Sequence, residues 1–226
     1  MYLKKNKYIR FFLLFYIIIF MLIELEDLNI KKKVKGIIHI GAHECEERNK
    51  YLNFFNLNDN NIIWIEALPD KVSKIIYKNP NILIFNECIY DKDNENIIFH
   101  ITNNYESSSI LKLKNHLIEH PHIYEINQIP LKTKTLKTFY KENNLIPDNY
   151  NFLNLDIQGT ELNALKSAEN LLEYFDYIYT EVNIGELYEN CSLLNEIDEY
   201  LQKFNFKRVN ISITKHNWGD AFYVKE

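Results

Sequence analysis

The chain contains few glycines, prolines and cysteines. Its 226 residues include five glycines, five prolines and three cysteines. The glycines are too scattered to form the Gly-x-Gly-x-x-Gly turn of many dinucleotide-binding enzymes, which argues against a dehydrogenase. Cys45, Cys88 and Cys191 are odd in number, widely separated and without a Cys-x-x-Cys pair. Neither a disulfide framework nor a cysteine zinc site is therefore predicted.

The chain also has no excess of positive charge. It carries 26 Lys and Arg against 31 Asp and Glu, a formal net charge of -5, and its lysines are scattered. Because no basic face is indicated, a nucleic acid is excluded as a partner. His116, His120 and His122 lie in a polar stretch where a solvated segment is the simpler interpretation, so no metal site is predicted.

The N-terminal residues differ in composition from the rest of the chain. Basic residues precede an unbroken apolar run, Phe11–Ile23, and acids follow it. Counted over 8–25, with Arg10 reaching the membrane surface, the run has 18 residues, close to the ~20 that span a bilayer. No small-residue cleavage signature follows, which favours a retained signal-anchor over a removed signal peptide.

These features predict three segments. Residues 1–28 form a hydrophobic segment, either a signal-anchor or a transmembrane helix, 29–35 form a linker, and 36–226 form one catalytic-sized domain. We then expect a membrane-associated protein with a single pass through residues 8–25. A buried N-terminal helix packed on a cytoplasmic domain is the alternative.

Beyond the linker, short β-branched runs alternate with longer amphipathic stretches. This pattern is typical of βαβ units around a mostly parallel sheet. Two late runs flank His216-Asn217-Trp218-Gly219 and predict a C-terminal hairpin at the sheet edge. The expected strands are 37–40, 62–65, 82–87, 97–101, 152–155, 177–182, 207–213 and 221–224, and the expected helices are 46–56, 71–78, 161–172 and 195–204.

A glycine and an acid end the first two predicted strands. Gly41 closes Ile37–Ile40, and Glu66 closes the second strand 25 positions later. This is close to the ~20-residue separation expected when a turn approaches a nucleotide and a carboxylate binds its ribose hydroxyls. Amides after Gly41 could face the carboxylate end of that ligand. The pair predicts an adenosine-containing cofactor; a solvated strand-end acid is the alternative for Glu66.

Further acids end later strands, beside the crevice where open α/β sheets bind ligands. Asp156 could bind the cofactor's amino group, orient an acceptor hydroxyl or act as a base. Gly159 permits a sharp turn, after which Glu161 could serve the site or cap the following helix. Glu181, followed by Asn183, is expected to face the acceptor as a base or binding group.

Four motifs span the ends of predicted strands. They are His39-Ile40-Gly41-Ala42-His43-Glu44, Trp64-Ile65-Glu66-Ala67, Phe152-Leu153-Asn154-Leu155-Asp156-Ile157-Gln158-Gly159-Thr160-Glu161-Leu162 and Tyr179-Thr180-Glu181-Val182-Asn183. Together these motifs resemble the FkbM family of S-adenosylmethionine-dependent methyltransferases, and their order and spacing agree over Lys35 to the C-terminus. The resemblance implies a Rossmann-like class I methyltransferase fold, with a mostly parallel seven-stranded sheet, helices on both faces and a C-terminal antiparallel hairpin.

The resemblance also implies a cofactor and a reaction. The cofactor is S-adenosyl-L-methionine, and the expected reaction is methyl transfer to an oxygen of a sugar, a glycan or another small hydroxylated acceptor. Asp156 and Glu181 are the predicted catalytic residues. The predicted cofactor-binding residues are His39, Gly41, Ala42, His43, Glu66, Ala67, Cys88 and Asp156, and no metal is expected.

Some positions depart from the family pattern or have a plain alternative. His39 stands where most relatives carry an acid, and a buried histidine satisfied by backbone groups explains it as well. Cys45 stands where many relatives have glycine, and a small buried filler is its simplest role. Ser107 to Ser109 could line the acceptor pocket or form an exposed loop. A catalytically inactive nucleotide-binding module of the same fold is the alternative function.

Overall fold

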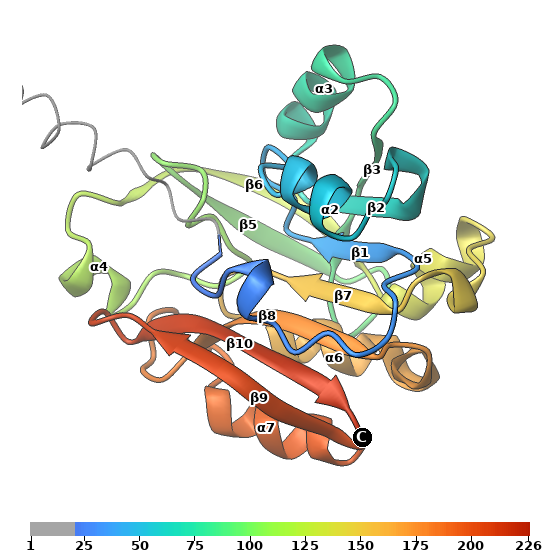
Figure 1. Cartoon of the computed structure of the whole chain (residues 1–226). Coiled ribbons are helices and arrows are strands. Elements are labelled where there is room, and N and C mark those ends of the chain that lie inside the picture. Colours follow the sequence, from blue (N-terminus) through green and yellow to red (C-terminus); the bar gives the residue numbers. More distant parts are fainter. Residues whose placement is uncertain (1–20) are drawn as a thin grey trace, which may run out of the picture.

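The computed structural model describes residues 21–226. Its larger sheet has seven strands in the order β3-β2-β1-β7-β8-β10-β9, and a smaller one has the order β4-β6-β5 (Figure 1). In the larger sheet β10 runs antiparallel to both neighbours, and the remaining pairs are parallel. The predicted fold, including the C-terminal hairpin, is confirmed. The strands are β1 (Ile37–Ile40), β2 (Ile62–Glu66), β3 (Leu83–Asn86), β4 (Cys88–Ile89), β5 (Asn96–Thr102), β6 (Glu125–Lys134), β7 (Phe152–Leu155), β8 (Tyr177–Asn183), β9 (Phe206–Ile213) and β10 (Trp218–Lys225).

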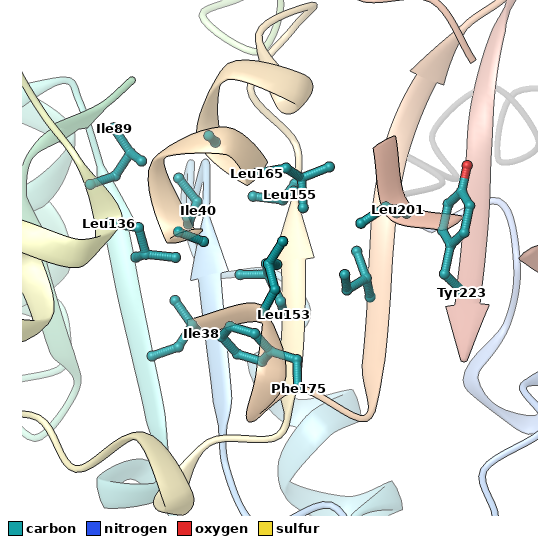
Figure 2. Packing of buried hydrophobic residues seen from close by; sticks show 14 of the residues in the cluster. Ile38, Ile40, Ile89, Leu136, Leu153, Leu155, Leu165, Phe175, Leu201 and Tyr223 are labelled. Carbon is teal, nitrogen blue, oxygen red and sulfur yellow. The ribbon is translucent and has the colours of Figure 1, made fainter. Parts of the chain in front are cut away.

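Helices cover both faces of the larger sheet, because successive residues of its buried strands point to opposite sides. On one face Ile38 and Ile40 pack with Leu165 of α6 and Leu201 of α7 (Figure 2). On the other face, Trp64 packs in a second apolar layer. The α-helices are α2 (Arg48–Phe54), α3 (Pro69–Lys78), α4 (His116–Glu119), α5 (Leu136–Glu142), α6 (Glu161–Ala168) and α7 (Leu194–Gln202), and 3-10 turns occupy Leu25–Asp27, Asp59–Asn61, Pro147–Asn149 and Glu169–Glu173.

Two strands of the smaller sheet, β4 and β6, were missed by the sequence pattern. β6 spans ten residues, but most of them are exposed and Pro130 interrupts the run. Neither a buried apolar run nor a clean alternation is therefore visible in the sequence. Its partner β4 has only two residues. α5 was also missed, although Thr135 caps it by accepting a hydrogen bond from the Thr138 amide at 3.1 Å.

The prediction of a membrane-spanning segment is wrong for its described part. Among residues 21–226, no helix has the length and apolar character needed to cross a membrane. Met21, Ile23 and Leu25 are buried in the protein core instead. The Leu22 amide donates to Asp220 Oδ2 at 2.7 Å, which ties this segment to β10. Residues 8–20 of the expected span lie outside the described residues.

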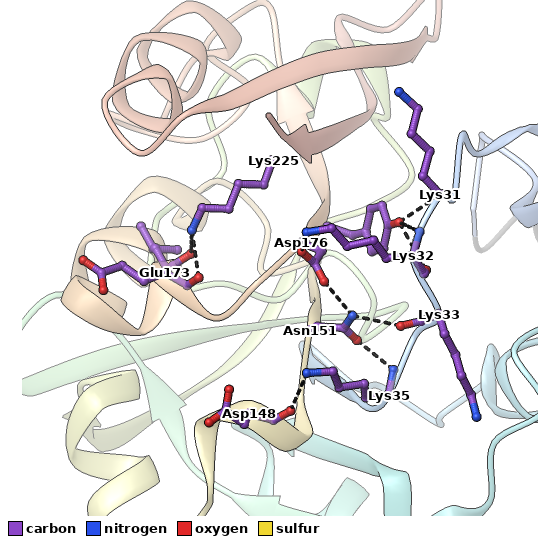
Figure 3. Close-up of polar contacts among 11 residues, drawn as sticks. Lys31, Lys32, Lys33, Lys35, Asp148, Asn151, Glu173, Asp176 and Lys225 are labelled. Carbon is purple, nitrogen blue, oxygen red and sulfur yellow. Dashed lines mark hydrogen bonds and ion pairs between the residues drawn. The ribbon is translucent and has the colours of Figure 1, made fainter.

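The predicted linker, residues 29–35, lies along the domain surface (Figure 3). Asn151 holds it through two contacts: its Oδ1 accepts from the Lys35 amide at 2.7 Å, and its Nδ2 donates to the Lys33 carbonyl at 3.0 Å. The Tyr177 hydroxyl accepts from the amides of Lys31 and Lys32 at 2.9 and 2.6 Å. These bonds fix the path by which the N-terminal segment approaches β1.

Candidate active site

A cavity of about 280 Å³ lies where β1, β2, β7 and β8 end. This is the carboxyl edge of the parallel strands, where open α/β sheets bind ligands. Of the predicted site residues, His39 alone is absent from its lining. The structure brings the other eight together around this one cavity: Gly41, Ala42, His43, Glu66, Ala67, Cys88, Asp156 and Glu181.

Gly41 is required by the protein's own backbone. Its φ is +91°, and a Cβ added there would lie 1.7 Å from the carbonyl oxygen of Asp156. The amides of Gly41 and Ala42 both donate to the Ile65 carbonyl, at 2.9 and 3.0 Å. The Ala42 amide, the first of those expected to face a ligand, is therefore used to close the turn instead. The glycine allows the ends of β1 and β7 to approach each other beneath the cavity.

Glu66 is held by the turn that it faces. Its Oε2 accepts from the His43 amide at 2.9 Å, and its Oε1 accepts from the Leu68 amide at 2.8 Å. Burial raises the pKa of this carboxyl group despite the two amide bonds. Each carboxylate oxygen can accept more than one hydrogen bond, so Glu66 retains acceptor capacity toward the cavity. The solvated strand-end acid considered from sequence does not describe it, because the residue is buried.

His43 forms the polar wall beside Glu66. Its Nδ1 lies 2.6 Å from Glu46 Oε1, and its Nε2 lies 2.8 Å from Lys71 Nζ. Burial lowers the pKa of His43, but the hydrogen bond and charge of Glu46 outweigh it, so the net shift is upward. His43 has a positive φ of 42°, which directs the chain sharply out of the turn.

An apolar slot adjoins Glu66 on the side of the smaller sheet. Cys88 and Ile89 follow β3 in the chain, and Leu68, Phe99 and Ile110 complete the lining. Burial raises the pKa of the Cys88 thiol to about 12, so this cysteine is a small apolar group rather than a nucleophile at neutral pH. The slot has the chemistry needed for a flat, weakly polar ring such as adenine.

The side chains of His39 and Glu161 contact other groups of the protein and not the cavity. His39 is buried in β1, where its Nδ1 lies 3.2 Å from the Tyr51 hydroxyl and its ring packs 4.7 Å from that of Trp64. Burial lowers its pKa to about 4. Glu161 accepts hydrogen bonds from the Ile157 and Gly159 amides at 3.0 to 3.1 Å, so its carboxyl group stabilises the turn that precedes α6. Neither side chain lines the cavity.

Gln158 joins the two predicted catalytic acids. Its Nε2 donates to Asp156 Oδ1 at 2.8 Å and to Glu181 Oε2 at 2.6 Å, and its Oε1 accepts from the Tyr188 hydroxyl. Burial raises the pKa of Asp156 and, more strongly, that of Glu181, to which the charge of Asp156 also contributes. Two buried carboxyl groups this close retain a proton between them, since both cannot easily be charged.

The sequence pattern did not identify several residues of the cavity wall. Asp220 comes from the hairpin and His116 from the short helix α4, and both are buried. Ser107 and Ser108, by contrast, were considered from sequence either as pocket lining or as an exposed loop, and the structure has both buried in the cavity wall. Asp220 could have been found from the sequence, because it is an acid on the inner face of a hairpin at the sheet edge. Nothing in the polar stretch around His116 distinguished it from its neighbours.

A family model of the FkbM methyltransferase domain matches residues 39–208. The chain belongs to the FkbM methyltransferase family. The match includes the turn after β1, Glu66 and the Asp156–Glu181 pair. No curated protein matches the chain significantly. S-adenosylmethionine is the cofactor that this family implies.

The solved structure of an FkbM methyltransferase agrees with this fold. The FkbM methyltransferase from Methylobacillus flagellatus superposes with a TM-score of 0.56 and 10% identity, over 90% of this chain and 46% of that one. The present chain thus spans a little under half of that relative. The magnesium protoporphyrin IX methyltransferase from Synechocystis, solved with bound SAM, gives a TM-score of 0.45 and 8% identity over 84% of this chain and 70% of that one.

Proposed function

We propose that this FkbM-family protein transfers the methyl group of S-adenosylmethionine to a hydroxyl oxygen of a sugar or another small hydroxylated acceptor. The observation that carries the proposal is the shared cavity. Its lining includes Gly41, Glu66 and Cys88 together with the carboxyl pair Asp156 and Glu181. We assign the catalytic domain to residues 36–226, with residues 21–35 packed on that domain.

The residues present suit S-adenosylmethionine chemically. Glu66 has free acceptor capacity for ribose hydroxyls, and the apolar slot at Cys88 suits the adenine ring. Asp156 and Glu46 offer carboxylates to the donor's cationic groups. When bound, the cofactor supplies a methyl group already made electrophilic by the positive sulfur.

Asp156 and Glu181 then act on the acceptor. One carboxylate of the pair accepts the hydroxyl proton as the oxygen–carbon bond forms, while the electron pair of the carbon–sulfur bond stays on sulfur. The products are a methyl ether, a neutral thioether and a protonated carboxyl group. Gln158 holds both acids in place, so that the proton acceptor is oriented before the acceptor arrives.

The test is a titration of the full chain with S-adenosylmethionine and, separately, with NAD. We expect only the former to raise the melting temperature, and Glu66→Ala to reduce that rise. Glu199→Gln, an exposed acid on α7, is the control and leaves it unchanged. Stabilisation by NAD alone would refute the proposal. Labelled methyl donor then separates an enzyme from the inactive binding module, which would bind the donor but transfer no label to any acceptor.

A further inference from the structure

The acceptor side of the cavity, away from Glu66, has an acid with a free oxygen. Asp220 Oδ2 accepts hydrogen bonds from the Leu22 amide at 2.7 Å and from the Tyr179 hydroxyl. Its Oδ1 has no hydrogen-bond partner among residues 21–226. Asp220 is 6% exposed and lines the cavity. One carboxylate oxygen is thus available to a molecule bound there.

His116 supplies a second polar atom without a partner. The side chain is 5% exposed and lines the same cavity, and within the described chain its Nδ1 is buried with no hydrogen-bond partner. Its ring centroid lies 4.9 Å from that of His120 and 5.5 Å from that of Tyr188. Buried polar atoms are normally satisfied, so this nitrogen indicates a hydrogen-bonding group that arrives with a ligand.

The acceptor side provides no positive charge. Burial lowers the pKa of His116 to about 4, and burial together with His216 lowers that of His120, so both rings are neutral near pH 7. Eight Asp and Glu residues line the cavity, whereas no Lys or Arg among residues 21–226 does. A phosphate or carboxylate placed here would lose its hydration beside carboxylates without gaining a cation.

The remaining wall is aromatic. Tyr188 is buried and Trp218 is partly exposed, and both pack in one apolar cluster beside the cavity. An aromatic face contacts the C–H groups of a sugar ring, while a carboxylate and neutral imidazoles bind its hydroxyls. The wall thus offers both kinds of contact without a cation.

We propose that the acceptor is an uncharged, hydroxylated ring compound, such as a sugar unit without phosphate or carboxylate groups, and that Asp220 is the residue that rejects anionic acceptors. His116 and Trp218 bind the same molecule from the other sides. The inference rests on the proposed methyl transfer and narrows its substrate class.

The test uses matched acceptors with the full chain saturated with S-adenosylhomocysteine. Methyl hexosides are compared with their 6-phosphates and with the corresponding uronic acids, by thermal stability and by transfer of label from S-adenosylmethionine. We expect at least one neutral member to stabilise the chain and accept label better than its anionic partners. Equal or better response to the anionic partners, or no response to any neutral member, overturns the inference. Methylation of an anionic acceptor would leave the proposed function standing.

Asp220→Asn is compared with wild type at a pH above the pKa of about 7 of the Asp220 carboxyl group, so that the substitution removes a charge and keeps the shape. We expect the preference for neutral over anionic members to fall by about tenfold or more, the effect of removing one nearby charge. Asp148→Asn, an exposed aspartate on a 3-10 turn, is the matched control and leaves the preference unchanged. An unchanged preference in a folded Asp220→Asn variant that still binds S-adenosylhomocysteine would contradict the role of Asp220. If that variant does not fold, the wild-type comparison decides the substrate class.

Discussion

Asp220 lies directly opposite Glu181 in the antiparallel pairing of β10 with β8. Side chains of opposed residues project to the same face, so two carboxyl groups meet there, and Gln158 links Glu181 to a third, Asp156. Burial, more than charge, raises the pKa of Glu181 well above its usual range and that of Asp220 to about 7. The free protein therefore keeps protons in this cluster near neutrality.

The first prediction concerns the pH dependence of stability. Asp220 has a pKa of about 7 in the folded chain and an ordinary value of 3.8. Between these values the folded chain binds more protons, so the stabilisation that Asp220 contributes is fully present below pH 3.8 and is lost as the pH rises through 7. The unfolding free energy of wild type minus that of Asp220→Asn should fall by up to about 1.4 kcal/mol per pH unit.

Urea unfolding at several pH values measures this difference. Comparing wild type with Asp220→Asn cancels the contributions of the buried histidines, whose lowered pKa values act in the opposite direction. Asp148→Asn, at an exposed aspartate, is the matched control. A constant difference for Asp220→Asn would mean that Asp220 titrates normally in the folded chain.

The second prediction concerns the turn after β1. Gly41→Ala places a methyl group 1.7 Å from the Asp156 carbonyl oxygen at a φ of +91°. We expect the unfolding free energy to fall by more than about 2 kcal/mol, since either the turn or the end of β7 must move. In Gly185→Ala the added Cβ meets the exposed Asn217 side chain at 3.2 Å, and a loss below about 1 kcal/mol is expected. Equal losses in chemical unfolding would show that Gly41 is not under this constraint.

The site residues that the sequence predicted are those at the ends of buried strands. Glu66, Asp156 and Glu181 each lie at or near the end of a buried strand, and parallel strands place such ends at one edge. The cavity residues that were missed do not lie at such ends. His116 comes from a four-residue helix, and Asp220 from an antiparallel strand whose beginning, not its end, meets that edge.

For the N-terminal segment, the sequence pattern predicted a membrane anchor that the structure contradicts. An apolar run after basic residues fits a membrane anchor, and nothing in its composition distinguishes lipid from a protein core. The fold decides between them, because Met21, Ile23 and Leu25 fill a layer beside Trp64 that would otherwise be open to water. The contacts that hold this segment join residues about 150 to 200 positions apart in sequence, such as the Leu22 amide with Asp220, which no local pattern reveals.

The third prediction tests that packing. Leu25 is 1% exposed, so Leu25→Ala should lower the unfolding free energy of the domain by about 2–5 kcal/mol, the usual range for a buried leucine. Ile146→Ala, at a side chain that is 60% exposed, should change it by less than about 0.5 kcal/mol. Chemical unfolding of the full chain measures both. No loss in Leu25→Ala would mean that this segment does not belong to the core.

The fourth prediction concerns the carboxyl pair. Asp156→Asn and Glu181→Gln each remove one possible proton acceptor while keeping an oxygen near Gln158. If the pair accepts the acceptor's proton, at least one variant should lower kcat by about 100- to 10,000-fold. The affinity of Glu181→Gln for S-adenosylhomocysteine, measured by calorimetry, should change far less, because Glu66 and the slot at Cys88 are untouched.

The pH profile separates proton transfer from a structural effect. Because the pKa values of Asp156 and Glu181 are raised, the fraction of the pair with an ionised carboxylate increases with pH, and wild-type kcat should rise with pH. A variant lacking the base loses that rise, whereas a variant that merely distorts the site keeps it at a lower rate. Asp148→Asn should keep both the rate and the profile. If both Asp156→Asn and Glu181→Gln transfer methyl groups at the wild-type rate, proton removal does not depend on either acid of this pair.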